Sequence, residues 1–271
     1  MKINQKKCTR CKECIPYCPV GAIKSVHNKV IIDQNFCVEC GVCLRSAICT
    51  YEAFTPLNRK VNNPLEWLRF RFNRKVLKII TRLSPRLYRL KKPRSIRRIL
   101  SDPTVAFPLT NIYGRGTEEV KTNDVTRRYQ WGEIGFCIEV GRPGIGATIR
   151  EIQEFTVELA RIGVVFLPAN PISWMIKDSN GSLKARYLNE RVLSAVIEFK
   201  IKEVEINKIF DFIRRFDRET KNVFTVGIIS PLRTDGTIPI VDTIKQQGFH
   251  LSSHAKVNLG LGRRPEQKEL R

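Results

Sequence analysis

The chain has 271 residues, 42% of them hydrophobic, and a formal net charge of +22. This length favours two folded units over one, and the longest apolar runs fall far short of the roughly 20 residues that a membrane-spanning helix needs. Nine cysteines without a signal peptide indicate a reducing compartment and argue against a secreted disulfide scaffold, so we expect a cytoplasmic protein.

Eight of the nine cysteines lie in two runs within the first fifty residues. The runs read Cys8-x2-Cys11-x2-Cys14-x3-Cys18, followed by Pro19, and Cys37-x2-Cys40-x2-Cys43-x5-Cys49. Three thiolates at such spacing surround one small volume, which is typical of a multi-iron centre. A fourth ligand for each centre must come from elsewhere in the chain.

Residues 1–55 resemble the bacterial two-cluster ferredoxin domain in both cysteine runs, Pro19, Gly21-Ala22-Ile23 and Val30-Ile31-Ile32-Asp33. The resemblance implies two [4Fe–4S] clusters, each taking its fourth ligand from the other run. It assigns one cluster to Cys8, Cys11, Cys14 and Cys49, and the other to Cys37, Cys40, Cys43 and Cys18. The second run has five residues instead of three before its last cysteine, and Thr50 stands where proline is usual. We expect this difference to reshape the loop around the first cluster.

Other uses of the cysteines fit the pattern less well. Structural zinc sites usually take two separated cysteine pairs, whereas each site here is a triple with a remote fourth ligand. The ninth cysteine, Cys137, lies in the apolar context Ile134-Gly135-Phe136-Cys137-Ile138 and is predicted to be a buried core thiol.

Residues 56–102 are predicted to be a basic helical linker. Residues 56–100 contain fifteen Lys and Arg and a single acid, Glu66, so most of the net charge of the chain is concentrated there. Asn63 can cap a helix that Pro64 begins and Ser84-Pro85 ends, with apolar residues at helical spacing between them. The cations of this helix are candidates for docking a partner: Arg69, Arg71, Arg74, Lys75, Lys78 and Arg82.

Three interpretations of the basic helix stay open. Its apolar stripe can pack on the core of the protein itself and leave the cations in water. It can instead dock a redox partner protein of acidic surface. It can also contact a membrane surface or, with less support, nucleic acid.

Residues 103–271 predict an α+β sandwich built from a duplicated strand–helix–strand unit, at about 133–190 and 191–258. The first unit has strands at 133–140 and 164–167 and a helix at 147–162. The second has strands at 192–199 and 223–229 and a helix at 204–216. Phe136–Val140 and Ala195–Phe199 are similar at an offset of 59 residues. Antiparallel sheet covered on one face by the two helices is the expected arrangement.

Turn signals complete the prediction for this part. Asn180-Gly181 predicts a hairpin between strands at 172–177 and 183–188, Asp235-Gly236 predicts a further turn, and 249–257 is read as a closing strand. Two glycine-bearing loops, 141–146 and 111–117, are read as tight turns rather than anion sites. His250 and His254 are not expected to form a metal pair.

We therefore hypothesise an electron-transfer protein that relays single electrons through two [4Fe–4S] clusters to or within a partner redox enzyme complex. The alternatives are a ferredoxin-fused reductase with a substrate site in residues 103–271, and a cluster-bearing protein that binds nucleic acid or a membrane surface. No catalytic constellation is legible, so an enzyme acting alone is the less favoured hypothesis.

Overall fold

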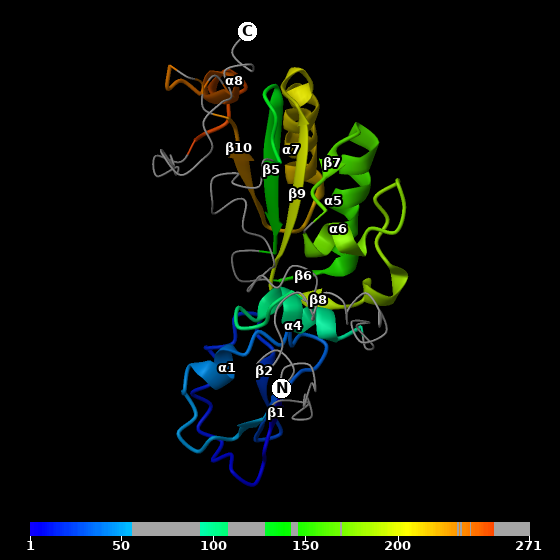
Figure 1. The fold of residues 1–271 in the computed structure, drawn as a ribbon. Coiled ribbons are helices and arrows are strands. Elements are labelled where there is room, and N and C mark those ends of the chain that lie inside the picture. Colours follow the sequence, from blue (N-terminus) through cyan, green and yellow to red (C-terminus); the bar gives the residue numbers. More distant parts are fainter. Residues whose placement is uncertain are drawn as a thin grey trace, which may run out of the picture.

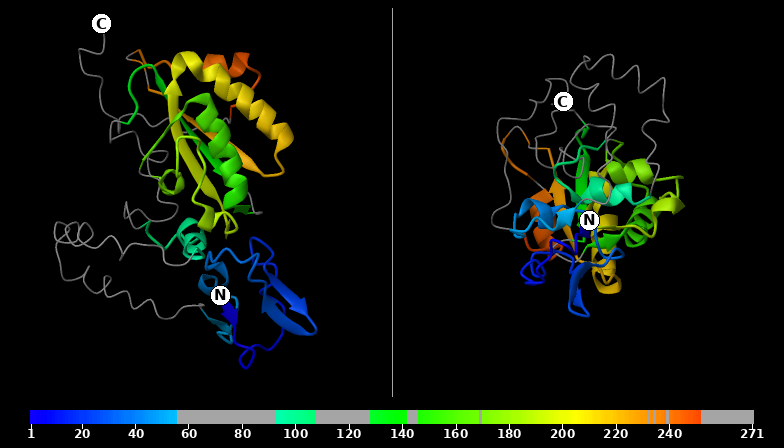
Figure 2. Two further views of the ribbon diagram at one scale, coloured as in Figure 1. Left: turned by 90° about the vertical axis from the view of Figure 1, so that its right-hand side faces the viewer. Right: turned by 90° about the horizontal axis from the view of Figure 1, so that it is seen from below.

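The computed structural model describes two parts of the chain and a helix between them. The amino-terminal unit comprises residues 1–55, and α4 (Ser95–Ser101) lies between it and a carboxy-terminal body (Figures 1 and 2). The described residues are 1–55, 93–107, 128–141, 146–168, 170–231, 233, 235–238 and 240–251. The predicted helix, which begins at Pro64 and ends at Ser84-Pro85, lies outside these residues together with all six docking candidates, so their role stays a prediction. No helix in the described ranges has both the length and the apolar character to cross a bilayer.

Two short antiparallel strand pairs frame the amino-terminal unit. β1 (Lys2–Ile3) pairs with β4 (Phe54–Thr55), and β2 (Ile23–Val26) pairs with β3 (Lys29–Ile32). The turn between β2 and β3 places His27 and Asn28 at φ 45 and 56, the left-handed backbone that a two-residue hairpin loop requires. The two cysteine runs lie in the loops between these strands.

A four-stranded antiparallel sheet forms the centre of the body. Its order is β10 (Phe224–Ile229), β5 (Glu133–Val140), β9 (Ala195–Lys202) and β7 (Val165–Phe166). β5 and β9 pair over eight residues, and Phe136 stacks on Phe199 across the pair with ring centroids 5.3 Å apart. Because side chains alternate along a strand, the face that carries these two rings turns an apolar surface towards the helices.

Helices α5 (Ile149–Ile162) and α7 (Ile206–Glu219) pack on that face in one buried cluster. Thr148 caps α5 by accepting from the backbone N–H of Glu151, whose carboxylate accepts in turn from the N–H of Thr148. Gly163 ends the helix in the left-handed conformation at φ 90. Phe155 of α5 contacts Phe216 of α7 with ring centroids 4.5 Å apart, which joins the two helices over the sheet.

The chain passes through the body as two successive strand–helix–strand segments, β5-α5-β7 and β9-α7-β10. In the sheet they interleave, because β9 lies between β5 and β7, and β5 lies between β9 and β10. The predicted strand at 133–140 is confirmed, and the predicted helices at 147–162 and 204–216 match α5 and α7 within three residues at each end. The strand expected at 192–199 begins at Ala195 instead. That the two segments arose by duplication stays a prediction.

The predicted hairpin around Asn180-Gly181 is largely wrong. Residues expected as its first strand form helix α6 (Pro171–Met175), because the Asn170 side chain accepts from the N–H of Ile172 at 2.7 Å and Pro171 begins the helix. The expected second strand contains a 3₁₀ helix, Ala185–Tyr187. The predicted pairing is limited to the bridge between Ile176 and Leu183, with backbone hydrogen bonds from Lys177 to Ser182 at 2.7 Å and from Lys184 to Met175 at 3.0 Å. Local capping therefore outweighed the strand pattern.

The end of the described chain also differs from expectation. Gly236 adopts φ 83 in the predicted turn, and a short helix, α8 (Ile240–Gln246), follows it. Residues 249–251 are not in a strand, so the predicted closing strand is wrong over the part that is described. The rest of that strand, including His254, lies outside the described residues.

Helix α4 comes from the last part of the predicted linker. Its Ile96, Ile99 and Leu100 are buried in the core of the body, and the Ser101 hydroxyl accepts from the N–H of Leu193 at 2.8 Å. Two short strands of the body, β6 (Ala147–Thr148) and β8 (Arg191–Val192), lie at the end of the sheet beside α4 (Figure 1). The helix is thus anchored on the body and presents its remaining side to the amino-terminal unit.

Candidate metal centre

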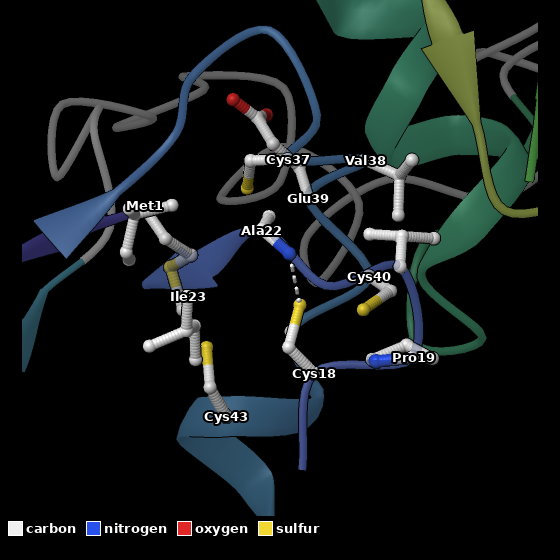
Figure 3. Close-up of a pocket in the computed structure, with 13 residues that line it drawn as sticks. Met1, Cys18, Pro19, Ala22, Ile23, Cys37, Val38, Glu39, Cys40 and Cys43 are labelled. Atoms are coloured by element: carbon white, nitrogen blue, oxygen red, sulfur yellow. Dashed lines mark hydrogen bonds between the residues drawn. The ribbon is translucent and has the colours of Figure 1, made fainter. Parts of the chain in front are cut away.

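The structure gathers the eight cysteines of the two runs around two cavities. One cavity is lined by Cys18, Cys37, Cys40 and Cys43, and we call it the inner cavity because Arg97 of α4 donates to the carbonyl of Cys37 in its wall. Figure 3 shows the four sulfurs pointing into the space between them. The other, the outer cavity, is lined by Cys8, Cys11, Cys14 and Cys49. Each cavity thus combines three cysteines of one run with the last cysteine of the other.

Both cavities are built from the same local framework. Ile3 and Ile32 each end a strand five residues before the first cysteine of a run, and Ile23 and Phe54 each begin a strand five residues after the last. The cavities are also alike in size, with about 340 and 350 Å³ of empty space including the part open to solvent. Nothing in their size or donor set sets one cavity apart from the other.

Left-handed backbone recurs at equivalent places in the two halves. Arg10 and Lys12, on either side of Cys11, have φ 64 and 67. Their counterparts around Cys40 are Glu39 and Gly41, with φ 58 and 74. Non-glycine residues adopt this conformation rarely, and they do so where the surrounding structure requires it. The second cysteine of each run, Cys11 or Cys40, is therefore flanked on both sides by residues in the left-handed conformation, and these residues define the turn of its loop.

Backbone amides point at the last sulfur of each run. The N–H of Ala22 donates to Sγ of Cys18 at 3.1 Å, the dashed line in Figure 3. The N–H of Ala53 donates to Sγ of Cys49 at 3.4 Å. Hydrogen bonds to ligand sulfurs are one of the means by which a protein sets the potential of an iron–sulfur centre.

The thiols lie in surroundings that disfavour a free thiolate. Burial raises the pKa of Cys14 and Cys40. Burial and then the neighbouring thiols Cys40, Cys37 and Cys18 raise the pKa of Cys43 to about 12. These groups hold their protons at neutral pH unless a metal replaces them, so ligand binding and proton release are coupled.

The donor set fits an iron–sulfur cluster better than a single ion. Within the described ranges, no three Cys, His, Asp or Glu side chains form a group that could hold one metal ion. Instead, four soft thiols surround each cavity, and thiolates are the usual ligands of [4Fe–4S] clusters.

Comparison with known proteins agrees with this geometry. The 4Fe-4S binding domain family matches residues 1–24. Ferredoxin-2 of Chlorobaculum tepidum is 47% identical over 34 residues, which are 12% of this chain and 55% of that protein. The amino-terminal domain is of the ferredoxin type. It therefore binds at least one [4Fe–4S] cluster.

The similarity is confined to a short part of the chain. An uncharacterized protein of Methanocaldococcus jannaschii is 46% identical over 55 residues, 20% of this chain and 13% of that protein. The chain thus spans about an eighth and about half of the lengths of these two relatives. No solved structure matches the chain.

The two-residue insertion in the second run is accommodated by one turn of helix. α1 (Val42–Arg45) includes Cys43, and Ala47 adopts φ 51 before the chain reaches Cys49. The equivalent segment of the first run, residues 14–18, contains no helix, so the two loops of this domain differ in shape. The effect expected around the first cluster stays a prediction. Arg45 of α1 donates to the carbonyl of Cys40 at 2.5 Å and pairs with Asp102, at the end of α4, at 2.8 Å.

Two arginines of the α4 segment, Arg94 and Arg97, also bind the ferredoxin-type domain. Arg97 is buried, donates to the carbonyl of Cys37 at 2.8 Å, and pairs with Glu190 of the body at 2.5 Å. Arg94 pairs with Glu39 at 2.5 Å. Guanidinium groups therefore bind the backbone of Cys37 and Cys40 and the side chain of Glu39, and they also join the two parts of the chain.

The sequence alone does not indicate this arginine cluster. Arg97 and Arg94 lie 55 to 63 residues along the chain from their partners in the ferredoxin-type domain, and no local pattern marks them. The predicted core thiol Cys137 is buried on β5 in the body, as expected, and lines neither cysteine cavity. The loop at 111–117 and residues 142–145 of the loop at 141–146 lie outside the described residues. At the ends of the second loop Gly141 and Gly146 adopt φ 94 and 69, and the N–H of Gly146 donates to the carbonyl of Gly141 at 3.0 Å, in agreement with the tight turn that was predicted.

Proposed function

We propose that the chain is an electron-transfer protein that carries two [4Fe–4S] clusters and passes single electrons through them. The observation that carries this proposal is the pair of similar cavities, each lined by four thiols, in a ferredoxin-type domain. A cluster bound in such a cavity supplies a site that accepts and returns one electron. Two adjacent sites in one small domain suit a relay.

In this proposal Cys8, Cys11, Cys14 and Cys49 hold the outer cluster, and Cys18, Cys37, Cys40 and Cys43 hold the inner one. The thiolates bind iron after losing their protons. The amides of Ala22 and Ala53 donate to bound sulfur and so favour the more negative, reduced state. The apolar residues Ala22, Ile23 and Val38 line the inner cavity and limit the access of water.

The partners of the relay are proposed to be redox proteins of acidic surface, because the chain has a formal charge of +22. Docking through Arg69, Arg71, Arg74, Lys75, Lys78 and Arg82 remains a hypothesis. The hypothesis that the same basic segment, residues 56–100, contacts a membrane surface or nucleic acid has less support. A cytoplasmic location likewise stays a prediction.

Anaerobic potentiometric titration followed by electron paramagnetic resonance tests the two-cluster proposal. We expect the fully reduced parent protein to hold two electrons, one per cluster, and a variant with Cys11→Ala to hold one. Uptake of only one electron by the parent protein would contradict a relay of two clusters.

A reductase with a substrate site in the body is the second candidate. It is favoured by the position of Gly146 of the body, since Val20 lines the inner cavity and its Cγ1 would lie 3.3 Å from a Cβ placed on Gly146. Gly146 therefore lies close to the wall of the inner cavity. Ligand-induced perturbation of the inner-cluster signal by a small molecule, with turnover in the absence of a second protein, would favour this candidate.

A further inference from the structure

The two halves of the ferredoxin-type domain allow one cavity to be compared with the other, residue by residue. At the inner cavity, the surface around Cys40, the second cysteine of its run, is covered by other residues of the chain. Cys40 is buried, Arg45 binds its carbonyl, and Arg94 pairs with Glu39 at 2.5 Å. This surface is therefore an internal interface, to which α1 contributes Arg45 and the α4 segment contributes Arg94.

The equivalent face of the outer cavity is open. Cys11, the counterpart of Cys40, is exposed, and so are Arg10 and Lys12 on either side of it. Lys6 and Lys7, which precede the run, are also exposed. We call Lys6, Lys7, Arg10, Cys11 and Lys12 the outer face.

The charge of the outer face is opposite to that of its counterpart. Glu39 at the inner cavity corresponds to Arg10, and Gly41 corresponds to Lys12. From residue 6 to residue 13 the chain has four cations and one acid, Glu13. Electrostatic complementarity with such a face requires carboxylates on the partner, and it speeds encounter at low ionic strength.

Exposure of a ligand cysteine also matters for electron exchange. A donor or acceptor that contacts Cys11 would approach the outer cluster directly, whereas Cys37 and Cys40 are buried behind the arginines and the body. In the structure, the second cysteine of the outer cavity is thus accessible to a partner, whereas that of the inner cavity is covered.

We propose that the outer face docks an acidic electron-carrier protein, so that single electrons pass between this partner and the outer cluster, and between the outer cluster and the inner one. This inference rests on the proposed two-cluster function and adds to it a docking site. One electron leaves one centre and reduces the next at each step, with no bond made or broken.

The test uses flavodoxin as the probe, because it is an acidic protein that accepts single electrons. The full chain is reduced anaerobically with dithionite, freed of excess reductant, and mixed with oxidised flavodoxin in a stopped-flow instrument. The test variant is Lys6→Glu with Arg10→Glu, where the second change copies the residue that occupies the same left-handed position at the inner cavity. The matched control is Arg218→Glu with Lys221→Glu, two exposed cations of the body with the same change in charge.

We expect the second-order rate constant at low salt to fall at least tenfold in the test variant and to change less than twofold in the control. Salt should slow the parent protein and leave the test variant almost unaffected. Equal rates in all three proteins would overturn the docking proposal. So would loss of binding to phosphatidylserine vesicles in the test variant with an unchanged flavodoxin rate, because the face would then belong to a lipid surface.

Iron content and resonance spectra separate this proposal from the proposed function. Both variants should keep the iron and the two signals of the parent protein. If the parent protein itself lacks a second signal, the two-cluster function fails and not the docking site alone. If the test variant loses iron, the single substitution Lys6→Glu, which lies outside the cysteine run, replaces it, and an unchanged rate there would again overturn the proposal.

Discussion

Substitution of Arg97 by Met should open the interface between the ferredoxin-type domain and the body. The Arg97 side chain is only 8% exposed, and its guanidinium binds Glu190 at 2.5 Å and the carbonyls of Gln34 and Cys37 at 2.8 Å each. Met fills a similar volume but donates no hydrogen bond. The substitution therefore leaves a mostly buried carboxylate and two backbone carbonyls without this donor.

The expected cost follows from these contacts. Removing one partner of a buried ion pair typically costs about 3–5 kcal/mol. Glu190 retains 15% exposure of its side chain, so water compensates in part and we take about 3 kcal/mol, the lower end of that range. Since about 1.4 kcal/mol corresponds to a factor of ten, opening of the interface should become roughly 100-fold more frequent.

Hydrogen–deuterium exchange on the anaerobic, cluster-loaded protein measures this opening without requiring reversible unfolding. Peptides that cover α4 and residues 34–40 should lose about two orders of magnitude of protection. The neighbouring Arg98→Met is the matched control, because Arg98 is 48% exposed and lies 3.4 Å from Asp102, a pair worth less than about 1 kcal/mol. Equal protection in the two variants would refute the idea that Arg97 holds the interface.

Other substitutions test separate parts of the account. Cys49→Ser should remove the outer-cluster signal, roughly halve the iron content and leave the inner signal in place; loss of the inner signal alone would refute the exchange of ligands between runs. Cys137→Ala should leave the iron content unchanged, because this thiol lies on β5 in the body, and metal analysis checks it. Gly181→Ala should destabilise the body by more than about 2 kcal/mol in denaturant unfolding, since its Cβ would lie 2.2 Å from the backbone oxygen of Thr156 and its φ is 78. An unchanged midpoint would contradict that steric argument.

The sequence predicted the elements whose pattern repeats over many residues. β5, α5 and α7 could be predicted because each carries a long alternating or helical apolar pattern. Residues 172–177 were misassigned because a short apolar run does not distinguish strand from helix, and the Asn170-Pro171 cap decided the outcome. Element ends shifted by a few residues for the same reason, as in β9, where the apolar run continues beyond the segment predicted.

The candidate site likewise has a part that the sequence predicted and a part that it did not. The two groups of cysteines followed from spacing, which is local, together with the resemblance to ferredoxins. The contacts of Arg97 with Cys37 and of Arg45 with Asp102 depend on how distant parts of the chain dock, and their residues lie 57 to 60 positions apart. A basic residue within a basic stretch gives no sign that it is buried, so these contacts required the structure.

Quantitative analysis of iron and acid-labile sulfide in the anaerobically purified chain tests the central claim most directly. Two [4Fe–4S] clusters predict about eight iron atoms and about eight sulfides per chain, four of each per cluster, with negligible zinc. A protein that holds only about four of each, or that holds zinc in the cysteine cavities, would contradict the two-cluster relay.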